Sequence, residues 1–185
     1  MTPPTIVFLN GTSSSGKTSI VSALQAILDE PYLTFSADLR KPMLPPFRQG
    51  LGWEVSGILD RLRQGYYGCL VALVEAGNYV IADQAMEDPA WIFACAETLK
   101  ETRTYFIGVR CELNVALQRE QARGDRTIGL VAEQHDKVHQ LGMYDFEVDS
   151  SEATPEDCAE QIKAYIGAHE PFALAQLREK KKMGG

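Results

Sequence analysis

The chain has 185 residues, of which 45% are hydrophobic and 23% charged, a composition that supports one globular domain with its own core. Its formal net charge of −7 argues against broad binding to nucleic acid or anionic lipid, so an anion would need a local positive site. Four scattered cysteines without a C-x-x-C pair indicate reduced thiols and not disulfides or zinc ligands. The sequence shows no signal-peptide pattern and no membrane-spanning apolar run, and we expect a cytoplasmic protein with no membrane or nucleic-acid partner.

The first half of the chain alternates apolar runs with segments of helical spacing. Residues 5–9 predict a buried strand, and residues 17–28 place apolar side chains on one face of a helix. A second strand is predicted at residues 32–35. The segment 41–52 is rich in Pro and Gly and predicts irregular structure, and helical spacing resumes over about 53–75.

The second half continues this alternation. It predicts a strand at 79–82, a helix around 89–100 and a strand at 104–109. The later elements are helices at 112–122 and 130–140, a strand at 146–148 and a helix at 155–168. The lysine-rich end, about residues 178–185, predicts a disordered or loosely packed tail.

The most specific motif lies between the first strand and the first helix. It fits G-x-x-x-x-G-K-[ST] and has the strand before it and the helix after it that this motif requires. Small residues let backbone N–H groups surround phosphate oxygens, the lysine reaches the β- and γ-phosphates, and the threonine hydroxyl can bind Mg²⁺. We therefore expect ATP and Mg²⁺ to bind at Gly11, Thr12, Ser13, Ser14, Ser15, Gly16, Lys17 and Thr18.

Five strands interleaved with helices predict an α/β fold. With the phosphate-binding loop, the expected architecture is a P-loop NTPase-type open sheet of about five parallel strands, with helices on both faces and a helical lid. No internal repeat or linker divides the chain, so residues 1–185 are expected to form a single domain.

Two aspartates follow predicted strands. Asp38 follows the second strand, where a carboxylate can accept the proton of a hydroxyl that attacks the γ-phosphate, although a turn aspartate is the alternative. Asp83 ends the apolar third strand in the manner of a Walker-B carboxylate, and with Thr18 it is the candidate ligand of Mg²⁺. Its alternative is again a turn residue.

Three arginines surround a break in helical spacing at Gly124-Asp125. Guanidinium groups on a mobile segment above a phosphate-binding loop can clamp phosphoryl oxygens, whereas a solvated basic face is the alternative. The break favours a lid over about residues 119–130. We expect Arg119 to bind nucleotide and Arg123 and Arg126 to act in catalysis, together with Lys17.

Several apolar residues and two histidines have less specific interpretations. His135 and His139 lie four residues apart without further ligands, so surface or core positions are expected. The apolar residues can line an acceptor pocket or simply fill the core. They are Pro45, Pro46, Phe47, Trp53, Met86 and Trp91.

The sequence resembles the chloramphenicol phosphotransferase family from Ile6 to about Ala168. Two segments are the most distinctive, A-R-G-D-R at Ala122–Arg126 and Y-D-F-E-V-D-S-S at Tyr144–Ser151. The other segments are F-L-N-G-T-S-S-S-G-K-T-S-I-V at Phe8–Val21, E-P-Y-L-T-F-S-A-D at Glu30–Asp38 and G-V-R-C-E at Gly108–Glu112.

The resemblance implies transfer of the ATP γ-phosphate, with Mg²⁺, to a hydroxyl of a small molecule. Chloramphenicol is the leading acceptor, through 3-O-phosphorylation in antibiotic resistance. Asp38 would be the catalytic base, Lys17 and Thr18 the phosphate and metal partners, and Arg123 and Arg126 the lid. Two acceptor-side features depart from the family pattern. Asp83-Gln84 stands where the family has two aspartates, and the segment 39–42 is more basic than a neutral alcohol would need.

Other functions remain open at this point. A kinase for a nucleoside, a sugar or an amino-sugar would use the same chemistry, as would a toxin-like kinase acting on a nucleotide sugar. A regulatory ATPase that binds a partner is a further alternative. The chain lacks the N-K-x-D and D-x-x-G motifs of a GTPase switch. The sequence does not indicate an oligomeric state.

Overall fold

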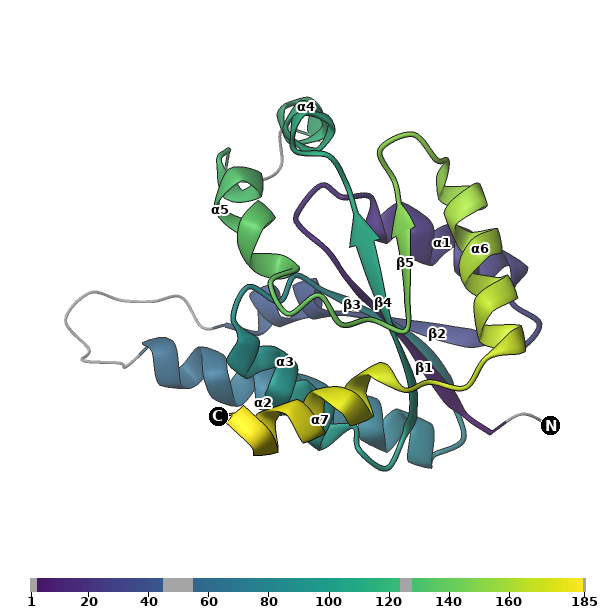
Figure 1. The fold of residues 1–185 in the computed structure, drawn as a ribbon. Helices are drawn as coiled ribbons and strands as arrows, with labels where there is room; N and C mark the ends of the chain where they lie inside the picture. The colour runs from purple at the N-terminus through teal and green to yellow at the C-terminus, as the bar shows by residue number, and fades with distance from the viewer. Residues whose placement is uncertain (1–2, 45–54, 124–127, 185) are drawn as a thin grey trace.

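A computed structural model describes residues 3–44, 55–123 and 128–184. Five parallel strands form one sheet in the order β2-β3-β1-β4-β5, as Figure 1 shows. The strands are β1 (Thr5–Asn10), β2 (Tyr32–Ser36), β3 (Tyr79–Gln84), β4 (Arg103–Arg110) and β5 (Phe146–Asp149). The predicted α/β architecture is therefore confirmed.

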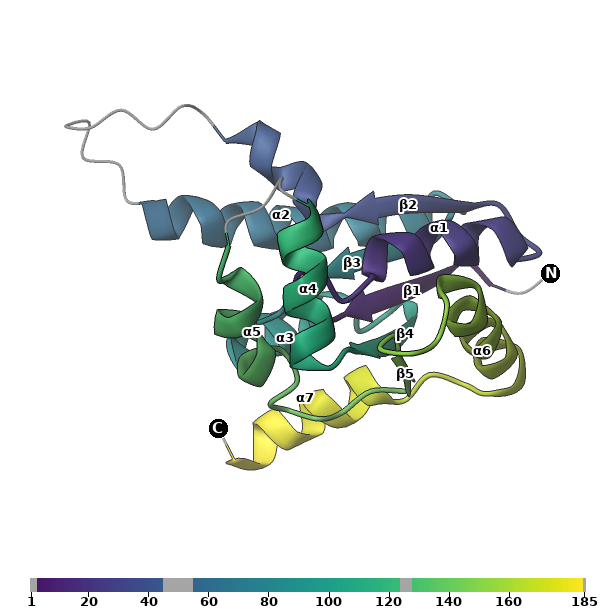
Figure 2. The ribbon, with the colours of Figure 1, turned by 90° about the horizontal axis from the view of Figure 1, so that it is seen from above.

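Helices cover both faces of this sheet because its central strand is apolar on both sides. Ile6 and Phe8 of β1 pack toward one cluster, and Val7 and Leu9 pack toward the other. The first cluster lies under α2 (Val55–Glu75), α3 (Pro89–Thr98) and α7 (Ala173–Gly184), and the second under α1 (Lys17–Ile27) and α6 (Pro155–Ala168). Figures 1 and 2 show these two layers. None of the described helices has the length and apolar character needed to cross a membrane.

Two further helices lie beyond the carboxyl ends of the strands. They are α4 (Leu113–Arg123) and α5 (Leu130–Val138); Figure 1 shows α4 above the arrowhead of β4 and α5 to the left of it. A 3-10 helix, η1 (Ala37–Met43), follows β2 at the same edge of the sheet. Part of the segment expected to be irregular therefore has helical turns.

The C-terminal segment differs from the sequence-based expectation. The tail predicted over about 178–185 is helical as far as Gly184, as part of α7. This helix is anchored because Ala173, Leu174 and Leu177 are buried against the sheet. Asp145 fixes its start, since its Oδ1 accepts hydrogen bonds from the backbone N–H groups of residues 172 and 173 at 2.5 and 2.9 Å. Burial of these three apolar side chains stabilises the helix even though exposed lysines follow them in the sequence.

Candidate active site

The loop between β1 and α1 has the close packing that its small residues predict. A Cβ atom at Gly11 would lie 2.6 Å from the carbonyl oxygen of Val109, so a larger residue would displace backbone. Gly16 has a φ of 86° and Ser14 a φ of 58°, both in the left-handed region. The sequence thus supplies the residues that allow the loop to turn its amides inward.

Lys17 extends back over this loop. Its side chain is only 8% exposed, and its Nζ donates hydrogen bonds to the carbonyl oxygens of Gly11 and Thr12 at 2.8 and 2.6 Å. The Ser14 hydroxyl is buried and has no hydrogen-bond partner among the described residues. A desolvated cation and an unsatisfied hydroxyl at the start of a helix fit the oxygens of a phosphate group.

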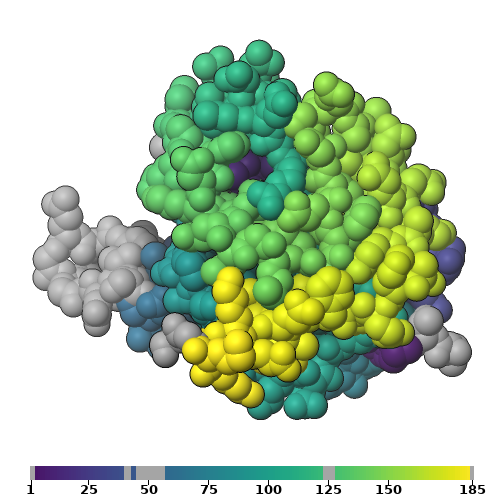
Figure 3. All heavy atoms as spheres, in the orientation of Figure 1, coloured from purple at the N-terminus to yellow at the C-terminus, as the bar shows by residue number. Residues whose placement is uncertain are grey.

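Two cavities border the loop, and Ser14, Gly16 and Thr18 line both of them. The β3-side cavity, of about 290 Å³, lies among the loop, η1, α2, the end of β3, α3 and α5. The β5-side cavity, of about 500 Å³, lies among the loop, α1, α4 and the start of α6. In Figure 3, atoms of the purple N-terminal segment are visible in a hollow bordered by the green α5.

The β3-side cavity brings residues of the phosphate-binding motif together with both predicted aspartates. Lys17 and Thr18 come from the start of α1, Asp38 from η1 and Asp83 from β3. The strand order explains this placement. Since β3 lies between β1 and β2, the carboxyl ends of all three strands meet beside the loop. The backbone N–H of Asp38 donates to the Ser36 hydroxyl at 3.2 Å, which fixes the turn that carries it.

Two further polar residues line this cavity: Arg63, which sequence reasoning missed, and Gln84, which it noted only as a departure from the family pattern. Arg63 lies on α2 in line with the buried Tyr66, Tyr67 and Leu70. A charged residue at core spacing was the available signal. Gln84 ends β3 and is 3% exposed, and both polar atoms of its side-chain amide lack hydrogen-bond partners within the described part of the chain. Trp91, whose role the sequence left open, lines the same cavity.

Arg119 lines the β5-side cavity. Its Nη2 donates to the carbonyl oxygen of Ser150 at 2.7 Å. The Ser150 hydroxyl in turn donates to the carbonyl oxygen of Ser15 at 2.7 Å, so the segment after β5 supports both the loop and this arginine. Of the other predicted lid arginines, Arg126 and the side chain of Arg123 lie outside the described residues.

The helices α4 and α5 are joined by a buried carboxylate. Glu120 of α4 is 2% exposed, and its two oxygens accept hydrogen bonds from the backbone N–H groups of Gly129 and Val131 at 3.0 and 2.9 Å. These bonds from the first turn of α5 lower the pKa of Glu120. The same residue therefore replaces the missing side-chain cap of α5.

Gln134 connects α5 to the phosphate-binding loop and to the segment that follows β3. Its Oε1 accepts a hydrogen bond from the backbone N–H of Ser13 at 2.7 Å, and its Nε2 donates to Glu87 at 2.7 Å. Because Gln134 is 5% exposed, these bonds are shielded from water. The sequence offered no signal for this bridge, which depends on how α5 packs over the loop.

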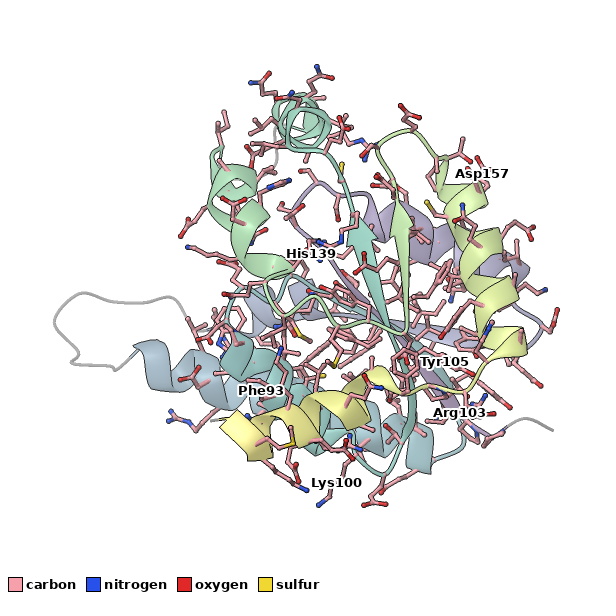
Figure 4. All side chains as sticks on the ribbon, viewed as in Figure 1. Phe93, Lys100, Arg103, Tyr105, His139 and Asp157 are labelled. Carbon is pink, nitrogen blue, oxygen red and sulfur yellow. The ribbon has the colours of Figure 1, made fainter. Side chains whose placement is uncertain are left out.

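A hydrogen-bonded network supports the loop from behind. Asn10 donates to the Tyr144 hydroxyl at 2.8 Å, and that hydroxyl shares a 2.7 Å hydrogen bond with Nδ1 of His139. Desolvation, with a smaller effect from Arg110, lowers the pKa of His139 to about 4, so its ring is neutral at pH 7. Figure 4 labels this histidine at the end of α5. The imidazole is thus a half-buried packing group, as the sequence allowed.

The metal prediction depends on Thr18 and Asp83, which both line the β3-side cavity. Across residues 3–44, 55–123 and 128–184, no three His, Cys, Asp or Glu side chains are grouped as metal ligands. Mg²⁺ in nucleotide sites commonly takes one or two protein oxygens and completes its shell with phosphate oxygens and water. A hydroxyl and a carboxylate beside a phosphate loop fit that donor set.

Solved structures with the same fold include several small-molecule kinases. The APS kinase CysC of Mycobacterium tuberculosis superposes with a TM-score of 0.70 at 12% identity, over 90% of this chain and all of that chain. The tunicamycin resistance protein of Deinococcus radiodurans gives 0.60 at 22% identity, over 92% and 99% of the two chains. Shikimate kinase of Acinetobacter baumannii gives 0.60 at 15% identity, over 90% and 94%. These likenesses establish the P-loop kinase fold.

Sequence relatives identify the family. The Mycobacterium tuberculosis protein named "Putative O-phosphotransferase Rv2636" is 27% identical to this chain, over 95% of this chain and 88% of its own length. A family model described as chloramphenicol phosphotransferase-like protein matches residues 4–167, nearly the whole chain. The chain therefore belongs to the chloramphenicol phosphotransferase-like family and is a kinase-like O-phosphotransferase of the P-loop kinase fold.

Proposed function

We propose that this protein transfers the γ-phosphate of ATP to a hydroxyl group of a small molecule. The observation that supports this proposal is the shared cavity in which Asp38 lies with Lys17 and Thr18. A carboxylate that lines the same cavity as a phosphate-binding loop can act as the general base for an acceptor hydroxyl bound there. The β5-side cavity, with Arg119 on its wall, offers room for the adenosine part of the nucleotide.

The chain's own residues have distinct roles in this reaction. Asp38 takes the proton of the acceptor hydroxyl, whose oxygen forms a bond to the γ-phosphorus. The bond between that phosphorus and the β–γ bridging oxygen breaks, and ADP leaves with the electron pair. Lys17 and the loop amides stabilise the negative charge on the phosphoryl oxygens, while Arg123 and Arg126 are proposed to close over them. Mg²⁺ bound near Thr18 and Asp83 would add positive charge at the phosphates.

Chloramphenicol is the first acceptor to test because of the family to which the chain belongs. Phosphorylation at its 3-hydroxyl would make the protein a cytoplasmic antibiotic-resistance enzyme. Arg63 and Gln84 on the wall of the cavity favour a second candidate, a more polar hydroxyl metabolite such as a sugar, an amino-sugar or a nucleoside. A partner-binding ATPase would not need a carboxylate and buried donors in this cavity.

The test measures ADP release from MgATP with and without chloramphenicol, and the mass of the antibiotic afterwards. A gain of one phosphate group identifies the reaction. Asp38→Asn should lower the rate about 100-fold or more while ATP affinity stays within about twofold, since the base acts on the acceptor. Asp136→Asn is the matched control because its carboxylate is 98% exposed on α5. Full activity of the Asp38 variant would contradict its assignment as the base.

A further inference from the structure

Two side chains that line the β3-side cavity carry buried hydrogen-bond donors without acceptors among the described residues. The side-chain amide of Gln84 is almost fully buried, and neither its nitrogen nor its oxygen has a partner within the described part of the chain. The Arg63 side chain is 11% exposed, and its Nε–H likewise lacks an acceptor there. Unsatisfied polar groups of this kind are costly in a folded protein and often belong to binding sites.

The guanidinium of Arg63 is held in one orientation. Its Cζ lies 3.8 Å from the centroid of the Trp91 ring, so its plane is supported by an aromatic face. Its Nη1 donates to Asp60 at 2.6 Å, and Asp60 is itself 68% exposed to water. Asp60 therefore engages Nη1, while the buried Nε–H of this cavity-lining residue has no acceptor within the described part of the chain.

Another arginine of this chain shows what the Nε edge of a guanidinium recognises. Arg110 uses Nε and Nη2 to bind the two carboxylate oxygens of Glu147, both at 2.9 Å. This paired arrangement matches a planar carboxylate better than a single neutral oxygen. A charged donor out of water gains most from an ionised acceptor, which a carboxylate provides and a hydroxyl does not.

We propose that the acceptor of this phosphotransferase is a hydroxy acid, whose carboxylate binds the Nε edge of Arg63 while the Gln84 amide donates to its oxygens. The proposal rests on the proposed transfer to a hydroxyl but does not require chloramphenicol as the acceptor. Asp38 and Asp83 line the same cavity, as does Glu87, which is engaged by Gln134. Their negative charge directs the ligand's carboxylate to the Arg63 and Trp91 wall and its hydroxyl toward Asp38.

The test uses two pairs of small probes that differ in one group. D-glycerate is compared with glycerol, and D-gluconate with sorbitol, in the presence of MgADP. The readout is the ¹⁵N–¹H signal of the Arg63 Nε–H group, assigned by its loss in Arg63→Lys. We expect saturable shifts of this signal with the carboxylates and not with their neutral partners. Equal shifts for both members of a pair, or no shift with either carboxylate, would overturn the proposal.

Substitutions then assign the interaction to the two residues. Arg63→Lys keeps the charge but loses the paired donors, and Gln84→Glu places a like charge beside the ligand. Each should raise the Kd for the carboxylate probes about tenfold or more, as measured by calorimetry. Arg61→Gln is the matched control, because Arg61 is exposed two residues away on α2. Unchanged binding in the Arg63 and Gln84 variants would also refute the proposal.

Failure of this proposal is distinguishable from failure of the proposed function. If the carboxylates bind at Arg63 but no alcohol causes ADP release from MgATP, the hydroxy-acid site stands and phosphotransfer falls. If instead a hydroxy acid is phosphorylated at the same rate and with the same KM by the wild type and by Arg63→Gln, phosphotransfer stands and the inference that Arg63 binds the carboxylate is wrong.

Discussion

The half-buried imidazole of His139 should make the folded state sensitive to mild acid. Its pKa is about 4 in the folded chain and 6.5 for a free side chain. Between these values the unfolded state binds a proton that the folded state does not, so stability falls as the pH drops from about 7 to about 4 and then levels off. The full linkage amounts to about 2 kcal/mol at pH 5, or about 1 kcal/mol after allowing for solvent screening of a partly exposed ring.

Urea unfolding followed by tryptophan fluorescence at pH 7.5 and pH 5 measures this loss. His139→Gln can still hydrogen-bond to Tyr144 but has no proton to gain, so its stability should fall by about 1 kcal/mol less between the two pH values than that of the wild type. His135→Gln, on the same helix, should keep the full wild-type loss. If the wild type and His139→Gln lost stability equally, the cause would lie elsewhere and the reasoning would be refuted.

Four other substitutions test features of the fold and site. Asp145→Ala leaves three backbone N–H groups without an acceptor and should cost about 3 kcal/mol in urea unfolding. Gly11→Ala forces a Cβ against the Val109 carbonyl, and should weaken ATP binding in calorimetry as well as lower the melting temperature. Glu120→Ala should speed hydrogen exchange at the first amides of α5. Arg119→Ala should raise the Kd for ATP about tenfold with little change in acceptor affinity. For each substitution, a measured quantity equal to that of the wild type would contradict the corresponding prediction.

The order of strands and helices could be predicted because local patterns determine it. The five strands are short apolar runs, and the loop motif between β1 and α1 fixes where phosphate would bind. The helix α7 was missed because its lysines suggested a solvated tail. Its apolar residues Ala173, Leu174 and Leu177 carried the contrary signal at helical spacing, and Asp145, far away in the sequence, provides its cap.

The candidate site could be predicted only where a residue type has a fixed chemical role. Lys17, Asp38 and Asp83 were found because their positions after strands or in a motif imply a task. Arg63 was missed, and Gln84 was noted only as a departure from the family pattern, because their burial results from how α2 and α3 pack on the sheet. The distinctive segment 144–151 proved to carry supporting contacts as well, through Tyr144, Asp145 and Ser150.

The position of β1 at the centre of the sheet has a consequence for how such enzymes diversify. Its loop belongs to both cavities, but the remaining walls come from separate stretches of chain. Apart from α5, residues 37–91 build the β3 side, and residues 119–155 build most of the β5 side. Under the proposed function, mutations that alter which molecule receives the phosphate can therefore accumulate in one stretch while the other continues to hold the nucleotide. Acceptor preference and nucleotide use can thus be inherited, and engineered, as nearly independent traits.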